Sequence, residues 1–353
     1  MQVPFVDLKG QWAPLKDDIL KDWDDILTNA SFVGGSYLQK FEEELAEFCR
    51  TRYAVGVSTG TAALTAILRG LGVGPGDKVG VQAETFIASV YAVEQVGAEA
   101  VLLDSDTVAI TQLVPLKAYI TVHIYGEVDR NRCMRLRQNA KMAGCYLIED
   151  ACQAIGCPGV GEYGVAAAFS FYPAKNLGCA GQGGAVITND EALSIKIREY
   201  INQGWVGNGL HAAQGGNERL DSIQAAVLSI GLKSLSKWNS RRQAVAGMYD
   251  KGLPDMIAPL VTPGSNCVYH LYPVFLPSVE ARDSLSAYLK EHGVANARHY
   301  PIAITQQEGF RTPGFAELEN KLSRHLTLPM FPTMTDEQVE YVLETINAWS
   351  QNV

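Results

Sequence analysis

Lys175 lies in a segment that is typical of a constrained loop. The run Phe169-Ser170-Phe171-Tyr172-Pro173 leads into it, and the small-residue tract 179–185 follows. Most lysines are solvated at the surface, but the aromatic residues, the proline and the glycines favour a position withdrawn from water. A lysine in such a position has a lowered pKa, and its neutral amine forms Schiff bases with carbonyl compounds. The segment therefore predicts carbonyl chemistry at Lys175.

An acidic pair, Glu149-Asp150, ends an apolar run that reads as a strand. An isolated buried carboxylate is costly, so Asp150 needs a partner. A buried salt bridge or a helix cap would supply one. A protonated pyridine nitrogen would also supply one, as in enzymes that use pyridoxal phosphate (PLP). Together, Lys175 and Asp150 predict a PLP site in which both residues are catalytic.

The segment Ser58 to Ala62 joins a strand to a helix and is a candidate for binding the cofactor phosphate. Glycine permits close backbone approach, and a helix N-terminus offers free N–H groups and a positive dipole end. An ordinary N-cap explains the serine and threonines equally well. The position beside Lys175 in the expected sheet favours phosphate contacts from Gly60, Thr61 and Ala62.

Three more side chains are candidates for cofactor contacts. Phe86 begins a helix and would stack on a flat ring, although a core position is an equal alternative. Gln153 would reach the phenolic oxygen of the cofactor, and Ser170 would donate to the phosphate. No metal site is expected, because the cysteines and histidines lack ligand spacing.

Short apolar segments alternate with helical ones through the first half of the chain. Strands are expected at 53–57, 79–81, 100–103, 119–123, 145–148, 166–171 and 184–188. This alternation is typical of a largely parallel sheet with helices on both faces. Because ligands bind beyond the carboxyl ends of such strands, the candidate residues should converge on one crevice.

The remaining chain is expected to form a second unit. Residues 190–250 read as helical, followed by a strand at 269–276 and by helices at 280–292 and 334–349. We predict a large domain over residues 1–240, including an N-terminal helical segment. A smaller C-terminal α+β domain follows over 241–353.

Composition restricts the partners. The net charge of −9 and the lack of a Lys/Arg block argue against nucleic acid, and no apolar run approaches the length of a membrane span. Seven cysteines without a C-x-x-C pair indicate reduced thiols and a cytoplasmic protein. The run Gly159 to Gly164 matches G-x-G-x-x-G but does not lie between a strand and a helix, so we expect an ordinary loop.

With these residues in hand, the chain resembles the DegT/DnrJ/EryC1/StrS family of PLP-dependent sugar aminotransferases, which have fold type I. The likeness covers nearly the whole length, and the lysine and Glu-Asp-Ala-x-Gln motifs are its most specific parts. The matching segments include 3–8, 58–64, 85–88, 122–126, 149–154, 169–177, 217–226, 238–242, 299–301 and 328–332. The resemblance implies a large domain with a mostly parallel seven-stranded sheet flanked by helices.

The resemblance also implies roles for the candidate residues. Lys175 would form the internal aldimine and move the proton, and Asp150 would pair with the pyridinium nitrogen. Phe86 and Gln153 would contact the ring and its hydroxyl. Asn217 would reach the phosphate from a second subunit, which makes a homodimer with shared active sites the minimal active unit. The remaining implied contacts are Gly60, Thr61, Ala62 and Ser170 for the phosphate.

Substrate contacts are expected from His123, His299 and Tyr300, although a buried histidine held by hydrogen bonds is an equal alternative. The implied reaction moves an amino group from an amino acid, glutamate in most of the family, to a keto group of a nucleotide-linked sugar. The segments 3–8, 170–176 and 238–242 look more like 3-ketosugar than 4-ketosugar enzymes.

Several alternatives stay open. The acceptor could be a 4-ketosugar, a cyclitol or another keto alcohol. The family's dehydratases replace the lysine with histidine, which disfavours that activity here. A non-catalytic, regulatory member is disfavoured by the intact Lys175, Asp150 and Ser170. Gly216, Gln182 and the short segments 104–119 and 155–164 depart from the family pattern beside the substrate, so the sugar is left open.

Overall fold

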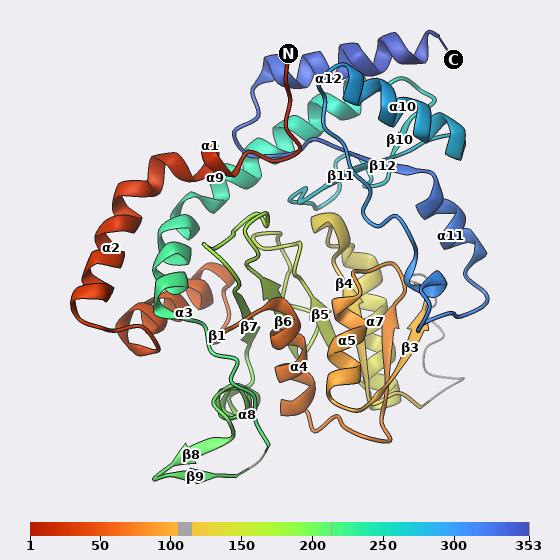
Figure 1. The fold of residues 1–353 in the computed structure, drawn as a ribbon. Coiled ribbons are helices and arrows are strands. Elements are labelled where there is room, and N and C mark those ends of the chain that lie inside the picture. The colour runs from red at the N-terminus through yellow and green to blue at the C-terminus, as the bar shows by residue number, and fades with distance from the viewer. Residues whose placement is uncertain (105–114, 213, 353) are drawn as a thin grey trace.

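The computed structural model describes residues 1–104, 115–212 and 214–352. One lobe contains a large sheet, and a second lobe contains a small sheet with the two chain ends beside it (Figure 1). Short 3-10 helices lie between the longer elements at η1 (Ala13–Leu15), η2 (Ile124–Gly126) and η3 (Ile304–Gln306).

The large sheet has seven strands in the order β1-β7-β6-β5-β4-β2-β3. Strands β2 to β6 all run parallel to one another, whereas β7 is antiparallel to both β1 and β6. The mostly parallel sheet is therefore confirmed. The strands are β1 (Tyr53–Val57), β2 (Lys78–Gln82), β3 (Glu99–Leu103), β4 (Ala118–Val122), β5 (Tyr146–Asp150), β6 (Ala166–Ser170) and β7 (Gly184–Thr188).

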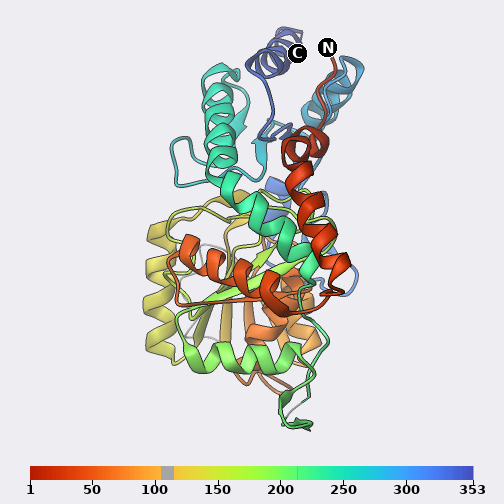
Figure 2. The same cartoon turned by 90° about the vertical axis from the view of Figure 1, so that its left-hand side faces the viewer.

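Helices cover both faces of this sheet, as Figure 2 shows for α7 on one side and α4 and α5 on the other. The helices α4 (Gly60–Gly70), α5 (Ala88–Gln95) and α8 (Glu191–Ile201) pack over one face with Ile120 and Ile148. The helices α3 (Gly35–Cys49) and α7 (Arg130–Ala143) cover the other face with Tyr119 and Leu147. Successive strand residues thus enter opposite cores, as the strand geometry requires.

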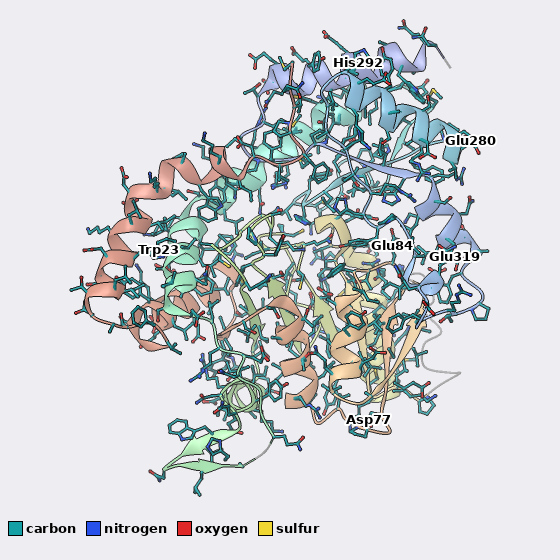
Figure 3. The ribbon with its side chains drawn as sticks, in the orientation of Figure 1. Trp23, Asp77, Glu84, Glu280, His292 and Glu319 are labelled. Atoms are coloured by element: carbon teal, nitrogen blue, oxygen red, sulfur yellow. The ribbon has the colours of Figure 1, made fainter. Side chains whose placement is uncertain are left out.

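A long helix, α9 (Ser222–Gly252), connects the two lobes. The N-terminal helices α1 (Leu8–Trp12) and α2 (Lys16–Thr28) lie along it. Trp23 points from α2 toward α9 and donates its Nε1–H to the carbonyl of Ile223 at 3.1 Å (Figure 3). Because α9 passes residue 240 without interruption, the division into 1–240 and 241–353 stays a prediction.

The second lobe is an antiparallel sheet covered by helices. Its strands are β10 (Ala258–Pro259), β11 (Tyr272–Phe275) and β12 (His325–Leu328), in that order. Its helices are α10 (Val279–Glu291), α11 (Ala316–Ser323) and α12 (Asp336–Ser350). Val3 forms a bridge with Val294, so the N-terminal segment pairs with this lobe.

The expectation that residues 190–250 are helical throughout is wrong for the described residues between the end of α8 at Ile201 and the start of α9 at Ser222. The strands β8 (Trp205–Gly207) and β9 (Leu210–His211) form a hairpin there, which projects from the large lobe (Figure 1). Asn208 and its flanking glycines have positive φ angles. Asn-Gly is a strong hairpin signal, so local turn chemistry overrides the helical surroundings. In the described part of the chain, no helix is long and apolar enough to span a membrane.

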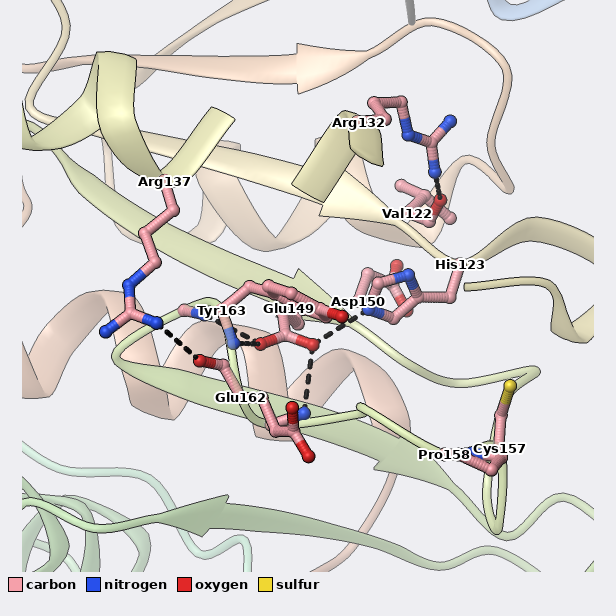
Figure 4. Close-up of polar contacts among 12 residues, drawn as sticks. Val122, His123, Arg132, Arg137, Glu149, Asp150, Cys157, Pro158, Glu162 and Tyr163 are labelled. Carbon is pink, nitrogen blue, oxygen red and sulfur yellow. Dashed lines mark hydrogen bonds and ion pairs between the residues drawn. The ribbon is translucent and has the colours of Figure 1, made fainter. Parts of the chain in front are cut away.

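A fully buried carboxylate, Glu149, fixes the connection between β5 and β6 (Figure 4). It accepts N–H bonds from Gly161, Tyr163 and Gly164 at 2.9, 2.8 and 2.7 Å, and its Oε2 lies 2.8 Å from Nε2 of His123. Burial raises the pKa of Glu149, but the His123 contact and the Gly164 and Gly161 N–H groups outweigh it and lower the pKa. The G-x-G-x-x-G run at residues 159–164 is a loop, and several of its N–H groups donate to Glu149.

Replacing Glu149 with glutamine should destabilise the fold by about 3 kcal/mol, since it leaves a buried network without its charge. Glu162→Gln, an exposed change in the same loop, is the matched control. Urea unfolding at several pH values measures both variants. Because the pKa of Glu149 is lowered in the folded state, its charge stabilises the fold at pH values above the ordinary pKa of glutamate. This stabilisation is lost as the pH falls through the folded-state pKa. The difference between wild type and Glu149→Gln should therefore shrink in acid. A difference that does not change with pH, or a variant as stable as Glu162→Gln, contradicts this account.

Candidate active site

The loop that carries Lys175 connects the end of β6 to the start of β7 and is held from behind. The Lys175 N–H donates to the Tyr172 carbonyl at 2.8 Å. The buried Asn176 amide donates to Asn239 Oδ1 at 2.8 Å and to the Val268 carbonyl at 3.0 Å. These bonds tie the loop to α9 and to the segment leading into β11. The backbone at position 175 is thus fixed independently of any ligand.

The Lys175 side chain is half-buried beside Asp150 and Cys152. Burial lowers the pKa of its ammonium group, and the charges of Cys152 and Asp150 offset part of that shift. A lowered pKa increases the fraction of neutral amine at a given pH, which is the form that attacks a carbonyl. Lys175 and Asp150, expected from the sequence to meet, lie within electrostatic reach of each other.

Asp150 ends β5 with its carboxylate held by two donors. Ser89 Oγ donates to Oδ2 at 2.6 Å, and the Cys152 N–H donates to Oδ1 at 3.1 Å. Glu149, its neighbour on the strand, faces the opposite side of the sheet. Each Asp150 oxygen retains acceptor capacity beyond these bonds, since an ionised carboxylate has about four lone-pair sites. The carboxylate can therefore still accept a proton-bearing ring nitrogen.

The N-terminus of α4 lies beside Ser170. Thr59 is the N-cap, and its Oγ1 accepts the Ala62 N–H at 2.9 Å. The N–H groups of Gly60 and Thr61 belong to the first turn, where no helical carbonyl precedes them. A Cβ on Gly60 would lie 2.7 Å from Ser170 Cβ and 2.8 Å from Cys152 Sγ. Glycine is therefore required at position 60, where this turn approaches β6. The Ala62 N–H already donates to the Thr59 side chain.

Phe86, Gln153 and Tyr300 meet at the entrance between the lobes. The Phe86 side chain is 51% exposed, and its ring centroid lies 5.3 Å from that of Tyr300. Gln153 Nε2 donates to the Tyr300 hydroxyl at 3.0 Å, and Gln153 Oε1 accepts the Tyr125 N–H at 2.6 Å. A solvent-facing aromatic ring at this position offers a flat apolar surface.

The two other substrate candidates, both histidines, lie in different surroundings. His299 is half-buried, with its ring stacked on Phe5 at 5.5 Å and its Nδ1 3.1 Å from Thr327 Oγ1. Burial, then the charges of His325 and Lys175, lowers the pKa of His299 to about 4. His123 is fully buried against Glu149, on the side of the sheet away from Asp150. This geometry favours the buried-histidine interpretation for His123.

Asn217 lies on an exposed segment beside β1. Its Oδ1 accepts a hydrogen bond from Arg219 at 2.9 Å, and the next residue, Glu218, accepts the Ser58 N–H at 2.8 Å. The same segment bridges to Asn202, close to the projecting hairpin. Asn217 is thus on the surface near the α4 N-terminus, and its cofactor role stays a prediction.

Several polar residues that hold the site residues in place were not predicted from the sequence. Ser89 donates to Asp150, and Asn176 anchors the lysine loop. Lys321 of α11 donates to Glu84 at 2.8 Å, and the Tyr125 hydroxyl donates to the same carboxylate at 3.2 Å. The bond from Lys321 joins the two lobes. The signal available for Ser89 was a polar residue four positions after Thr85 in an apolar segment.

The donor set fits PLP. A flat aromatic cofactor with a phosphate requires an anion site, an apolar ring surface and a carboxylate for its ring nitrogen. Gly60 and Thr61 offer N–H groups, Phe86 offers an exposed aromatic ring, and the doubly held Asp150 offers a carboxylate. The amine of Lys175, with its lowered pKa, offers the nucleophile. These features belong to the chain itself.

Comparison with known proteins agrees with this geometry. The chain is 37% identical to a "pleiotropic regulatory protein" of Geobacillus stearothermophilus, covering 98% of both chains. It is 36% identical to the dTDP-3-amino-3,4,6-trideoxy-alpha-D-glucose transaminase of Streptomyces venezuelae, covering 100% of this chain and 97% of the relative. The crystal structure of ntda from Bacillus subtilis with bound cofactor PMP superposes with a TM-score of 0.93 at 28% identity, covering 99% of this chain and 85% of that one.

The family match extends over both lobes. Residues 14–347 match the DegT/DnrJ/EryC1/StrS aminotransferase family. Fold type I and the PLP cofactor, both expected from the sequence, are confirmed. The chain therefore belongs to the DegT/DnrJ/EryC1/StrS family and is a PLP-dependent aminotransferase.

Proposed function

We propose that the chain moves an amino group from an amino acid, L-glutamate, to the keto group of a nucleotide-linked sugar, with Lys175 and Asp150 as catalytic residues. The observation that carries the proposal is the position of the Lys175 amine, whose pKa is lowered, within electrostatic reach of the doubly held Asp150 carboxylate. A lysine with a perturbed pKa beside a specific charged partner is typical of a catalytic site.

The residues of the chain divide the work. Bound PLP supplies an aldehyde for the amine and a protonated ring that withdraws electrons. Lys175 carries the proton between reacting carbons, since a base with a lowered pKa is matched to this task. Asp150 holds the proton on the ring nitrogen through opposite charge. The phosphate contacts are assigned to Gly60, Thr61, Ala62 and Ser170, and the ring contacts to Phe86 and Gln153.

For the acceptor, we propose a 3-keto-(deoxy)hexose linked to a nucleotide. The Streptomyces venezuelae relative is named for a 3-amino sugar, and it matches the chain over its whole length. Tyr300 lies at the crevice beside Phe86 and Gln153, which supports a substrate contact. His299 lies next to it on the chain and faces away from solvent, and His123 has the weakest support. A 4-ketosugar, a cyclitol or another keto alcohol is the alternative acceptor.

A regulatory protein without catalysis is the alternative of another class. The name of the Geobacillus stearothermophilus relative raises it. The two hypotheses differ in what they require of Lys175. An aminotransferase needs a lysine that can accept and release a proton, whereas a binding protein does not. The lowered pKa of Lys175 and its position within electrostatic reach of Asp150 support catalysis.

The direct test is an absorption assay of the purified, PLP-loaded protein. Adding L-glutamate should bleach the yellow form to the amine form, and a nucleotide-linked 3-ketosugar should restore the colour. A panel of 3-ketosugars, 4-ketosugars and cyclitols identifies the acceptor. Lys175→Ala should bind PLP but turn over at background rate, because the nucleophile and the proton carrier are both lost. Full activity in that variant contradicts the proposal, and a protein that never takes up PLP favours the binding function.

We propose further that the active unit is a homodimer in which Asn217 contributes to the partner's site. The hairpin beside the Asn217 segment exposes Trp205, Val206 and Leu210, and exposed apolar side chains on a projecting arm are typical of subunit contacts. A cytoplasmic location is supported by seven free cysteines, which are usual in reducing compartments.

Asn217→Ala should weaken PLP binding about tenfold, the effect of losing one hydrogen bond to a charged phosphate. Asn131→Ala, an exposed asparagine on α7, is the matched control. Titration of apoprotein with PLP measures both, and sedimentation reports the dimer.

Mixing Asn217→Ala with Lys175→Ala subunits separates the two arrangements. If Asn217 acts across the interface, each mixed dimer contains one intact site, and at PLP concentrations too low to load Asn217→Ala the activity rises on mixing. If the activity does not rise, or if the PLP affinity of Asn217→Ala equals that of the control, the shared site is rejected.

A further inference from the structure

A chain of buried hydroxyl groups ends on the carboxylate of Asp150. Thr85 Oγ1 lies 2.8 Å from Ser89 Oγ, and Ser89 Oγ donates to Asp150 Oδ2 at 2.6 Å. Ser89 is fully buried, and Thr85 and Asp150 are 5% and 6% exposed. Solvent therefore competes little for these bonds.

The chain has one direction. A serine hydroxyl carries a single proton, and an ionised carboxylate only accepts. Ser89 must therefore give its proton to Asp150, so the Thr85 hydroxyl donates to the Ser89 oxygen. Successive bonds of this kind polarise one another in a medium of low dielectric.

We infer that Ser89, supported by Thr85, is a positioning residue for Asp150; this inference rests on the proposed role of Asp150 toward the ring nitrogen of PLP. Two donors reach the carboxylate from different sides: Ser89 at Oδ2 and the Cys152 N–H at Oδ1. They fix its rotation about the terminal torsion, which is otherwise broad. The remaining lone pairs are then presented in one orientation.

The orientation that this relay of hydroxyls sets matters because the carboxylate must direct a free lone pair at the pyridine nitrogen to hold its proton. Ser89 thus acts through Asp150 and touches neither substrate nor the reacting carbons in this account. In the described structure the Thr85 and Ser89 hydroxyls bond to each other and, through Ser89, to Asp150, and Ser89 is the second residue of α5.

The test uses the full-length protein reconstituted with PLP labelled with nitrogen-15 in the ring. The nitrogen-15 resonance reports protonation of the ring nitrogen in the absence of turnover. Wild type should show the protonated position, and Asp150→Asn the unprotonated one. Ser89→Ala should move the resonance part of the way toward Asp150→Asn. Thr85→Val, which keeps the volume and removes the first donor, should move it less.

Kinetics provide a second readout. Ser89→Ala should lower kcat about ten- to a hundredfold, the range for one lost hydrogen bond to a charged group, and Thr85→Val about two- to tenfold. The KM for the amino donor should stay unchanged, because the relay does not touch the donor. Ser229→Ala removes another buried hydroxyl, one without a hydrogen-bond partner in α9, and should match wild type in both measurements.

Two outcomes are decisive. If Asp150→Asn shifts the resonance while Ser89→Ala and Thr85→Val leave it at the wild-type position, the relay is rejected and the proposed function stands. If Asp150→Asn leaves the nitrogen protonated, the proposed role of Asp150 fails. A thermal unfolding curve excludes misfolding of Ser89→Ala, and Thr85→Val decides the matter if Ser89→Ala does not fold.

Discussion

The half-buried amine of Lys175 and the buried carboxylate of Asp150 lie within electrostatic reach of each other, and the rest of the structure holds them there. An isolated buried charge is costly, so each group needs its neighbours. The sheet brings them together because β5 and β6 run parallel, so that Asp150 and the loop after Ser170 emerge at the same edge. Asn176 then ties that loop to α9 and the second lobe. The site therefore depends on contacts made by both lobes.

The last two residues of strand β5 have different roles because their side chains point to opposite faces of the sheet. Adjacent side chains point to opposite faces, so Glu149 and Asp150 enter different environments. Glu149 is fully buried and accepts hydrogen bonds from the loop after β5, whereas Asp150 faces α5 and Lys175. Each carboxylate is held by donors that suit its own task. An acidic pair at a strand end can thus stabilise a fold on one face and serve an active site on the other.

Much of the fold was predictable because apolar strand segments are bounded by turn residues. Strands 53–57 and 184–188 have the predicted bounds, and the lysine loop lies between β6 and β7 as expected. The hairpin at 205–211 was missed because one glycine-rich turn was read within helical surroundings. Ser89 and Lys321 were missed because their partners are distant in sequence. Local pattern indicates which residues are reactive, but packing decides which residues hold them.

The central claim is that Lys175 is the lysine that binds the PLP aldehyde. Borohydride reduction of the PLP-loaded protein, followed by proteolysis and mass spectrometry, tests it most directly. The account predicts a reduced pyridoxyl adduct on the peptide that contains Lys175. An adduct confined to another lysine, or no adduct on a protein that has bound PLP, would contradict it.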